Sequence, residues 1–381
     1  MKLQDPVARY GRGAAASVPG LVASLPAQSV LLVHGARSFE VSGAAGMLSG
    51  FGRDVRVRRW WDFPPSPEVR DLAQGLSLVR ETRPDVVVGV GGGSVMDAAK
   101  LLCAFQDVPG DEVEEHVRAG KPVHTRRTKL VLVPTTAGSG SEATHFAVVY
   151  IGDSKFSVSG PALLPDATVL DPALSESGSA HQRAASGMDA LAQCVESLWA
   201  VDACVDSRSF ALRGARMLLS AIEDFVLSPH PGAARAMAVG SHLAGRAINL
   251  SRTTGAHALS YALTRRYGVS HGHAVALTLG AFMDAHADAG ASQLRRTVGW
   301  SAHRQALDDI AGLLGAPGPA LSGRHFVALG RRLGLHMALA DAGVRTSVEL
   351  RSLAAAVDSR RLSNNPVRFN RAELTELITG C

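Results

Sequence analysis

A buried strand that runs straight into three glycines and then a helix is the feature that most constrains this chain. Residues 85–90 (DVVVGV) are apolar after the initial aspartate, as in a strand buried on both faces of a parallel sheet. Gly91, Gly92 and Gly93 follow, before a helix expected over 94–105. Glycines let the backbone approach a ligand, and a helix N-terminus offers unbonded N–H groups. The pattern predicts a phosphate-binding turn, although tight strand–helix turns also need glycine for structural reasons alone.

Strands and helices alternate on both sides of this turn. Further apolar strands are expected over 29–34, 55–61, 129–133, 148–151 and 168–170, with a helix over 67–83. Such alternation predicts a doubly wound α/β domain over residues 1–175. Over residues 176–381 the apolar spacing is helical, and helices are expected over 189–200, 207–227, 233–250 and 347–356. The second domain is therefore predicted to be all-α.

Composition limits the classes of partner. Hydrophobic residues make up 46% of the chain, but no stretch of about 18 apolar residues occurs, so we expect a soluble, cytoplasmic protein and no membrane partner. The four cysteines form no CxxC pair, which fits a reducing compartment. The formal charge of +5 comes without a basic run interleaved with aromatics, so no nucleic-acid partner is expected. This charge is explained either by a solvated basic surface or by a site for an anionic substrate.

A second polar loop follows the expected strand 129–133. It reads PTTAGSGSEAT from Pro134 to Thr144. The hydroxyl groups of Thr135, Thr136 and Ser139 are suited to bind phosphate, ribose or a nicotinamide amide. The alternative is an ordinary Ser/Gly-rich surface turn.

Together, the GGGSVMDAAK and PTTAGSGSEAT motifs resemble the iron-containing (group III) alcohol dehydrogenase family, whose relatives include glycerol dehydrogenase and dehydroquinate synthase. The resemblance implies an α/β N-terminal dinucleotide-binding domain with a parallel sheet and an all-α C-terminal domain (dehydroquinate synthase-like). It also implies NAD(P)-linked alcohol or aldehyde chemistry. The cofactor-binding residues it implies are Gly91, Gly92, Gly93, Ser94, Asp97, Thr135, Thr136, Ser139 and Lys155.

Four side chains of the second half are candidate metal ligands. Asp189 and Gln193 are four residues apart on an expected helix and share one face, while His257 and His271 are 14 apart. A carboxylate with two imidazoles suits Fe²⁺ or Zn²⁺, but from spacing alone the histidines are equally explained as ordinary polar or core residues. The resemblance implies that all four residues bind one divalent metal ion.

Two positions depart from the family pattern. Gln193 stands where a histidine ligand is usual, and because an amide oxygen is a weaker ligand, a metal-free variant stays open. Tyr261 stands where many members have a histidine assigned to proton relay. The predicted catalytic residues are therefore His271, Tyr261 and His273, with the relay running through Tyr261, His273 or the cofactor ribose.

The turn after the first apolar strand bears on the cofactor. Family members often carry an aspartate there that binds the ribose 2′-hydroxyl, whereas this chain has Gly35. Gly35 removes charge repulsion against a 2′-phosphate, and Arg37 and Ser38 are suited to bind it. NADPH is therefore expected, with NADH as the alternative. If Arg37 is only a solvated surface residue, it does not bear on the cofactor.

Four stretches resemble the phosphonoacetaldehyde reductase branch of the family: ALAQCVESLWA, SRTTGAHALSYALT, SHGHAVALTLG and SNNPVRFNR. This resemblance implies reduction of phosphonoacetaldehyde to 2-hydroxyethylphosphonate. The candidate partners of the substrate anion are His145, Arg252, Arg265, His273 and Arg368. The alternatives are a generic short-chain alcohol or diol dehydrogenase, a dehydroquinate synthase-like lyase, and a non-catalytic nucleotide-binding relative. Family habit alone suggests a homodimer.

Overall fold

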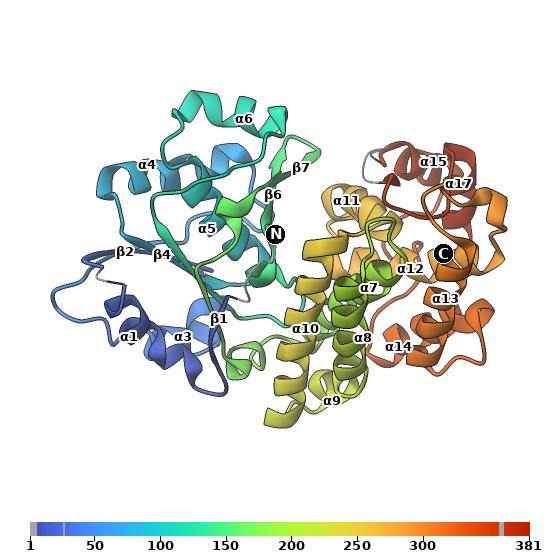
Figure 1. Ribbon diagram of the computed structural model, residues 1–381, viewed down its shortest axis with the longest axis horizontal. Coiled ribbons are helices and arrows are strands. Elements are labelled where there is room, and N and C mark those ends of the chain that lie inside the picture. Colours follow the sequence, from blue (N-terminus) through green and yellow to red (C-terminus); the bar gives the residue numbers. More distant parts are fainter. Residues whose placement is uncertain (1–5, 26, 358–361) are drawn as a thin grey trace. The chain divides into compact units, whose positions relative to one another are not determined.

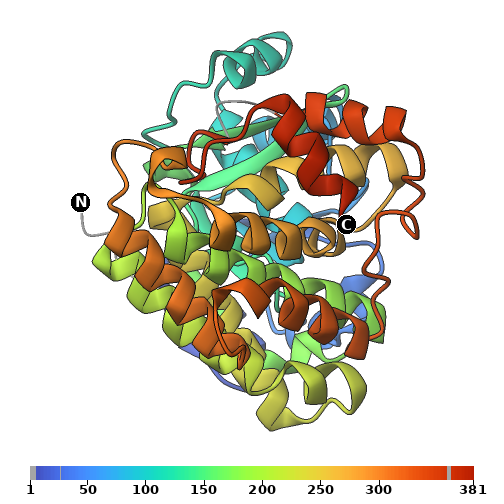
Figure 2. The ribbon, with the colours of Figure 1, turned by 90° about the vertical axis from the view of Figure 1, so that its right-hand side faces the viewer.

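The computed structural model describes residues 6–25, 27–357 and 362–381. Contacts divide the chain into two compact units, Met1–Gly178 and Ser179–Cys381. Figure 1 labels the elements of both units, and Figure 2 shows the same ribbon turned by 90°.

The first unit is built on a six-stranded sheet in the order β1-β8-β5-β4-β2-β3, and every neighbouring pair is parallel. Alternate residues face opposite sides: Leu31 and Val33 lie in one core with α4, α5 and α6, and Val30 and Leu32 in another with α1, α2 and α3. The predicted doubly wound fold is confirmed. Its strands are β1 (Val7–Tyr10), β2 (Ser29–His34), β3 (Arg56–Trp60), β4 (Val86–Gly91), β5 (Lys129–Pro134) and β8 (Ala167–Leu170).

The order of these strands locates a switch in topology. From β2 the chain moves outward to β3, and it then crosses to the other side of β2 to form β4 and, beyond it, β5. In open parallel sheets, ligands bind where the direction reverses, at the carboxyl ends of the strands. Here these ends are His34–Gly35 after β2 and Gly91–Gly93 after β4. The helices around the sheet are α1 (Val18–Ala23), α2 (Ser38–Val41), α3 (Ala44–Met47), α4 (Ala73–Thr82), α5 (Gly93–Phe105) and α6 (Val113–Ala119).

One expected strand leaves the main sheet. The segment predicted over 148–151 belongs to β6 (Phe146–Ile151), which pairs only with β7 (Ser154–Ser159) in an antiparallel hairpin. A two-residue turn, Gly152-Asp153, joins them, with Gly152 at a φ of 58°. Turns of this kind need positive φ and match the twist of a hairpin. The glycine-aspartate pair was the local signal for this hairpin.

The second unit is helical, as predicted. Its long helices approach closely at small residues: a Cβ on Gly214 of α8 would lie 3.1 Å from the carbonyl oxygen of Gly240 of α10. The helix expected over 207–227 is in fact two, because the backbone leaves helical geometry at Ala221 (φ −138°). The helices are α7 (Ala180–Trp199), α8 (Val205–Leu219), α9 (Ile222–Leu227), α10 (Pro231–Ser251), α11 (Gly255–Tyr267), α12 (His271–Asp288), α13 (Trp300–Leu314), α14 (Ser322–Arg332), α15 (Ser347–Ala355) and α17 (Arg371–Thr379). Within the described residues, none of the helices has the length and apolar character that crossing a membrane requires.

Candidate active site

The glycine turn after β4 lies against the polar loop after β5. A Cβ on Gly91 would lie 2.5 Å from the side chain of Val95, and one on Gly93 would lie 3.0 Å from Ser139. Thr135 N donates to the Gly91 carbonyl (3.0 Å), so the loop after β5 lies directly against the turn after β4. The N-cap residue of α5 is Gly92, which has no side chain to cap the helix. This leaves its first N–H groups available to an anion.

Two residues on α5 hold the second loop in place. Asp97 accepts from Ser141 Oγ (2.6 Å) and from Val148 N (3.0 Å). Lys100 is fully buried and donates to the carbonyls of Ser141 (2.6 Å), Thr144 (2.9 Å) and Phe146 (2.8 Å). Burial raises the pKa of Asp97 and lowers the pKa of Lys100 to about 8. Asp97 was predicted on the pyrophosphate side and stays a prediction there; one of its oxygens is bonded to this loop and the other to β6.

The remaining predicted cofactor residues of this region lie around the same turn. Ser94 Oγ accepts from Ser66 N (3.1 Å), and Lys155 lies on β7, opposite Tyr150 and near enough to Asp97 to oppose the rise of its pKa. Thr135 Oγ1 is buried and has no hydrogen-bond partner within the described part of the chain. A buried hydroxyl without a partner is unfavourable, so a ligand that bonds it would stabilise the loop. This observation fits a bound dinucleotide.

A basic cluster lies at the carboxyl ends of β2 and β3. Arg59 Nε donates to His34 Nε2 (3.1 Å), and His34 Nδ1 bonds the carbonyl of Gly35 (3.1 Å). Burial lowers the pKa of His34, so the ring is neutral with its proton on Nδ1. Arg37 and Ser38 begin α2 beside Gly35, and a Cβ on Gly35 would lie 2.2 Å from Ser38 Oγ. Arg59 was not among the predicted cofactor residues, because its only sequence signal was its place near the end of the neighbouring strand.

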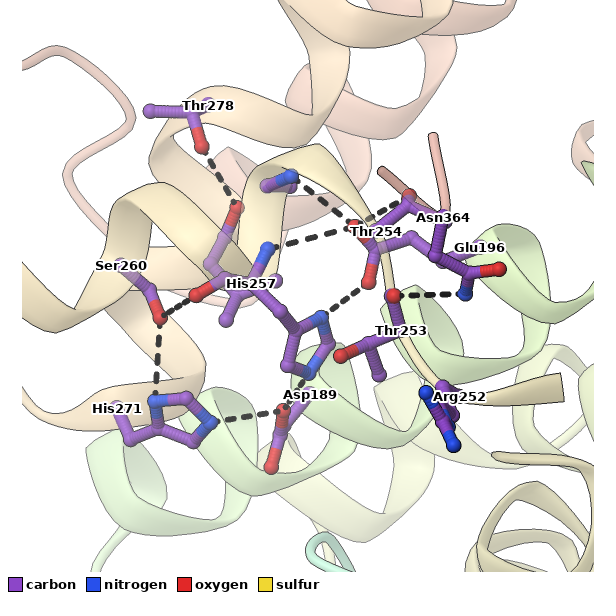
Figure 3. A network of polar contacts seen from close by, with 12 residues as sticks. Asp189, Glu196, Arg252, Thr253, Thr254, His257, Ser260, His271, Thr278 and Asn364 are labelled. Atoms are coloured by element: carbon purple, nitrogen blue, oxygen red, sulfur yellow. Dashed lines mark hydrogen bonds and ion pairs between the residues drawn. The ribbon is translucent and has the colours of Figure 1, made fainter. Parts of the chain in front are cut away.

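Three predicted metal ligands converge in the helical unit. One ligand atom from each of Asp189, His257 and His271 lies within 4.8 Å of the others. His257 Nε2 is 3.3 Å and His271 Nε2 is 4.0 Å from Asp189 Oδ1 (Figure 3). Ligands bound to one ion at about 2.0–2.2 Å lie roughly 3–4 Å apart. His257 Nε2 is buried and makes no hydrogen bond within the described residues. The three residues therefore fit a divalent cation.

Neighbouring groups set the proton positions on both imidazoles. Glu196, fully buried on α7, accepts from His257 Nδ1, so Nε2 is the nitrogen of His257 that is left to bind a cation. Ser260 Oγ donates to the His257 carbonyl (2.8 Å) and therefore accepts from His271 Nδ1 (3.4 Å). Burial alone would lower the pKa of His257, but the carboxylates of Glu196 and Asp189 raise it to about 9, so a cation that binds Nε2 must displace a proton from it. Partners of this kind orient metal-binding histidines and raise their donor strength.

Glu196 also caps the N-terminus of α11, the helix that carries His257. Its Oε1 accepts from Ala256 N (3.0 Å) and His257 N (3.3 Å) at the start of α11, and from Thr254 Oγ1 (2.9 Å). Glu196 was not predicted from the sequence; its only signal there is that it lies seven residues after Asp189 and so on the same face of α7.

A glycine allows the helices to meet at the cluster. A Cβ on Gly272 of α12 would lie 2.2 Å from the carbonyl oxygen of Ala185 and 2.7 Å from Asp189 Cβ on α7. Only glycine permits this approach, which places the neighbouring His271 beside Asp189.

Comparison with known proteins identifies the family of this chain. Residues 6–172 match the family model described as iron-containing alcohol dehydrogenase, and residues 183–380 match its C-terminal counterpart. The chain belongs to the iron-containing alcohol dehydrogenase family. It is therefore an oxidoreductase linked to a nicotinamide cofactor, from a family that uses NAD(P) and a divalent metal.

Individual relatives of this family differ in substrate. The chain is 36% identical to the phosphonoacetaldehyde reductase of Streptomyces viridochromogenes over 83% of this chain and 80% of that protein. It is 29% identical to the long-chain-alcohol dehydrogenase 1 of Geobacillus thermodenitrificans over 72% and 70% of the two chains. The crystal structure of sulfoacetaldehyde reductase from Bifidobacterium kashiwanohense, in complex with NAD⁺, superposes with a TM-score of 0.87 at 26% identity, covering 100% and 98% of the two chains.

The two departures from the family pattern lie at different places around the cluster. Gln193 is buried one helical turn after Asp189 on α7, and it stays a predicted ligand. The ring of Tyr261 lies parallel to that of His271, with centroids 6.2 Å apart. His273 Nε2 instead bonds the carbonyl of His336 (2.7 Å), and its ring meets His181 edge-on. Of the two predicted relay residues, Tyr261 is therefore the one in contact with a predicted ligand.

The predicted anion partners are dispersed. His145 precedes β6 in the first unit, with its ring edge-on to Phe146. Arg265 is exposed in the last turn of α11. Arg368 donates to the carbonyls of Ser292 and Gln293 (3.3 Å for the latter). Arg252 ends α10, five residues before His257.

Proposed function

We propose that this enzyme reduces a small anionic aldehyde, phosphonoacetaldehyde in the first place, with NADPH as hydride donor and one divalent metal ion. The observation that carries the proposal is the convergence of Asp189 Oδ1, His257 Nε2 and His271 Nε2. The likeness to a phosphonoacetaldehyde reductase at 36% identity supports the substrate, and so does the likeness to a sulfoacetaldehyde reductase. The two named aldehydes share a short chain with a terminal anion.

The reaction adds a hydride from the reduced nicotinamide to the aldehyde carbon, while the carbonyl electron pair moves to oxygen and takes a proton. A bound divalent cation supplies Lewis acidity toward that oxygen. Asp189, His257 and His271 would hold the cation, with Gln193 as the predicted fourth ligand. Glu196 and Ser260 fix the two imidazoles. Tyr261, stacked on His271, is the group we assign to donate the proton.

The preference for NADPH rests on the carboxyl end of β2. Gly35 brings no carboxylate, and Arg37 and Ser38 follow it. Arg59 adds a second guanidinium, held by His34. Two cations without an acid at position 35 favour a 2′-phosphate over a free hydroxyl. The exposed Glu40, 3.7 Å from Arg59, is the nearby charge that opposes this preference.

Consumption of NADPH with a panel of aldehydes tests the proposal. Protein stripped by chelator and reloaded with Fe²⁺ or Zn²⁺ is assayed with phosphonoacetaldehyde, sulfoacetaldehyde and neutral propanal. We expect the highest kcat/KM with phosphonoacetaldehyde and no turnover without metal. Equal turnover of propanal would identify a generic short-chain alcohol dehydrogenase, and no cofactor consumption with any aldehyde would reject the reductase.

A further inference from the structure

The turn between α10 and α11 holds an arginine in a backbone conformation that suits glycine. Arg252 has φ 59° and ψ −177°. The other non-glycine residues with positive φ in the described chain are Ser66 and Arg83. Arg83 adopts φ 44° and ψ 60°, the left-handed conformation common at the end of a helix. The extended conformation with positive φ at Arg252 is nearly restricted to glycine, and such strain clusters at functional sites.

Asn364 stabilises this conformation from both sides. Its Nδ2 donates to the carbonyl of Ser251 (2.8 Å) and to that of Thr253 (3.0 Å), the residues that flank Arg252. Its Oδ1 accepts from Asp202 N (3.0 Å), and the side chain is largely buried. Figure 3 shows Asn364 and the turn above Arg252. The strain is therefore supported by a dedicated residue from a distant part of the chain.

The side chain of Arg252 is available to a ligand. It is 78% exposed, and its ion pair with Asp202, itself 50% exposed, spans 4.0 Å. Exposed pairs of this kind contribute little. Most of the five guanidinium N–H donors can therefore bind an anion as a fork.

The same turn is tied to the metal-ligand cluster. Thr254 Oγ1, two residues after Arg252, donates to Glu196, whose other oxygen holds His257. Arg252 thus has a fixed position relative to His257. By contrast, Arg265 lies eight residues after His257 on α11, about 12 Å along the helix axis at 1.5 Å per residue. Arg368 and His273 are bound to backbone carbonyls.

We propose that Arg252 binds the anionic end of the substrate and that Asn364 is the positioning residue that holds it there. This inference rests on the proposed function and selects one residue from the dispersed basic side chains. It also gives a role to the arginine and asparagine of the SRTTG and SNNP stretches, which metal and cofactor binding leave unexplained. The ligand class is a short aldehyde or alcohol ending in phosphonate or sulfonate.

Arg252→Gly is the decisive variant, because glycine adopts this conformation without strain and the fold should be retained. The metal-loaded variant is assayed with phosphonoacetaldehyde and with propanal. We expect kcat/KM for phosphonoacetaldehyde to fall about 10- to 100-fold, mainly through KM, because charge-assisted hydrogen bonds are lost. Propanal turnover should stay unchanged. Arg83→Gly, which removes an exposed arginine at positive φ in the other unit, is the matched control and should change neither substrate.

Non-reactive ethylphosphonate gives a second readout, as the rise in melting temperature that it causes. The rise should be present in wild type and Arg83→Gly, and lost in Arg252→Gly. Asn364→Ala should raise KM for the anionic aldehyde in an otherwise wild-type chain and add nothing to that change in Arg252→Gly. A positioning role predicts this non-additivity, whereas a purely structural role would lower turnover of both aldehydes alike.

Three outcomes would overturn the inference. Unchanged kinetics and ethylphosphonate response in Arg252→Gly would overturn it alone, with the reductase proposal intact. Equal losses with propanal and phosphonoacetaldehyde would assign Arg252 to the fold. Wild-type protein that reduces propanal but neither reduces phosphonoacetaldehyde nor responds to ethylphosphonate would overturn the proposed substrate class as well.

Discussion

The two units offer ligand groups in opposite ways. In the α/β unit, the candidate cofactor site consists of backbone N–H groups, hydroxyls and glycines whose missing side chains let two loops meet. In the helical unit, the site consists of buried ionisable side chains, Asp189, Glu196 and His257, each held by its neighbours. The first kind of site depends on the path of the chain and the second on charge and proton position. Substitutions in the first unit should therefore act through sterics, and those in the second through loss of ligand.

His271→Ala should have the largest effect. Removal of one of three converging ligands should abolish metal retention and lower kcat/KM at least about 1,000-fold, because Lewis-acid stabilisation amounts to several kcal/mol. Metal content by elemental analysis and NADPH consumption check both. His273→Asn, two residues along on α12, should retain the metal. Full metal content in His271→Ala would show that the helical unit does not hold its metal ion through this side chain.

Gly272→Ala tests whether helix approach assembles the ligands. Its new Cβ would meet backbone and Asp189 on α7, so we expect a loss of about 1–3 kcal/mol in the free energy of unfolding together with weaker metal binding. In Gly280→Ala, on the same helix, the Cβ would meet the Val327 side chain at 2.9 Å. That control should lose stability but keep its metal affinity. Equal metal affinity in the two variants would show that Gly272 has no specific role in assembling the metal ligands.

Gly91→Ala is the counterpart in the α/β unit. The added Cβ would lie 2.5 Å from Val95, and we expect a loss of about 1–3 kcal/mol in unfolding free energy with metal content unaffected. In Gly92→Ala the Cβ would be 3.4 Å from Thr136, an ordinary contact, and the loss should stay below about 1 kcal/mol. Denaturant unfolding distinguishes the two variants. Similar stability for both would contradict the steric account of the turn.

Gly35→Asp should shift cofactor preference from NADPH toward NADH by roughly 1–3 kcal/mol, through repulsion of the 2′-phosphate and a new bond to the ribose hydroxyl. Ser38 Oγ must rotate away, since it would lie 2.2 Å from the new Cβ. Gly35→Ala separates that steric part from the charge. The ratio of kcat/KM for the two cofactors is the measurement, and an unchanged ratio in Gly35→Asp would show that position 35 does not face the ribose.

Asp166→Asn should have the smallest effect. Desolvation raises the pKa of Asp166, but hydrogen bonds from Leu130 N and Arg126 outweigh it, so the folded pKa lies below the usual 3.8. The stabilisation is present above the unfolded pKa and is lost as pH falls through the folded one. Wild type should lose under about 1 kcal/mol more than the variant below pH 4. Urea unfolding across that pH range tests this, and parallel pH profiles would exclude the contribution.

The difference between the units also explains which features could be predicted from the sequence. Features made by adjacent residues were predictable, and contacts between distant residues were not. The glycine turn was predictable because strand, glycines and helix are adjacent, and β2, β4 and β5 lie within a residue of their expected ranges. The role of Glu196 was not predictable, because its partner His257 is 61 residues away and only the fold brings Glu196 to the first turn of α11. The β6–β7 hairpin was missed because a short apolar strand does not indicate which sheet it joins. The hydrogen bonds of Asp97 with Ser141 and Val148 were not predicted, because such contacts cannot be inferred from a motif.

The carboxylate of Glu196 serves both the first turn of α11 and the imidazole that α11 presents. A graft of this cluster onto another scaffold would therefore need parts of both α7 and α11. Transferred alone, α11 would lack the Glu196 carboxylate that accepts from its first N–H groups. Because Glu196 holds His257 through protein contacts alone, the position of this ligand does not depend on a bound ion. Purified protein lacking its ion should still hold His257 in its binding orientation, so different ions could be exchanged into one polypeptide without refolding it.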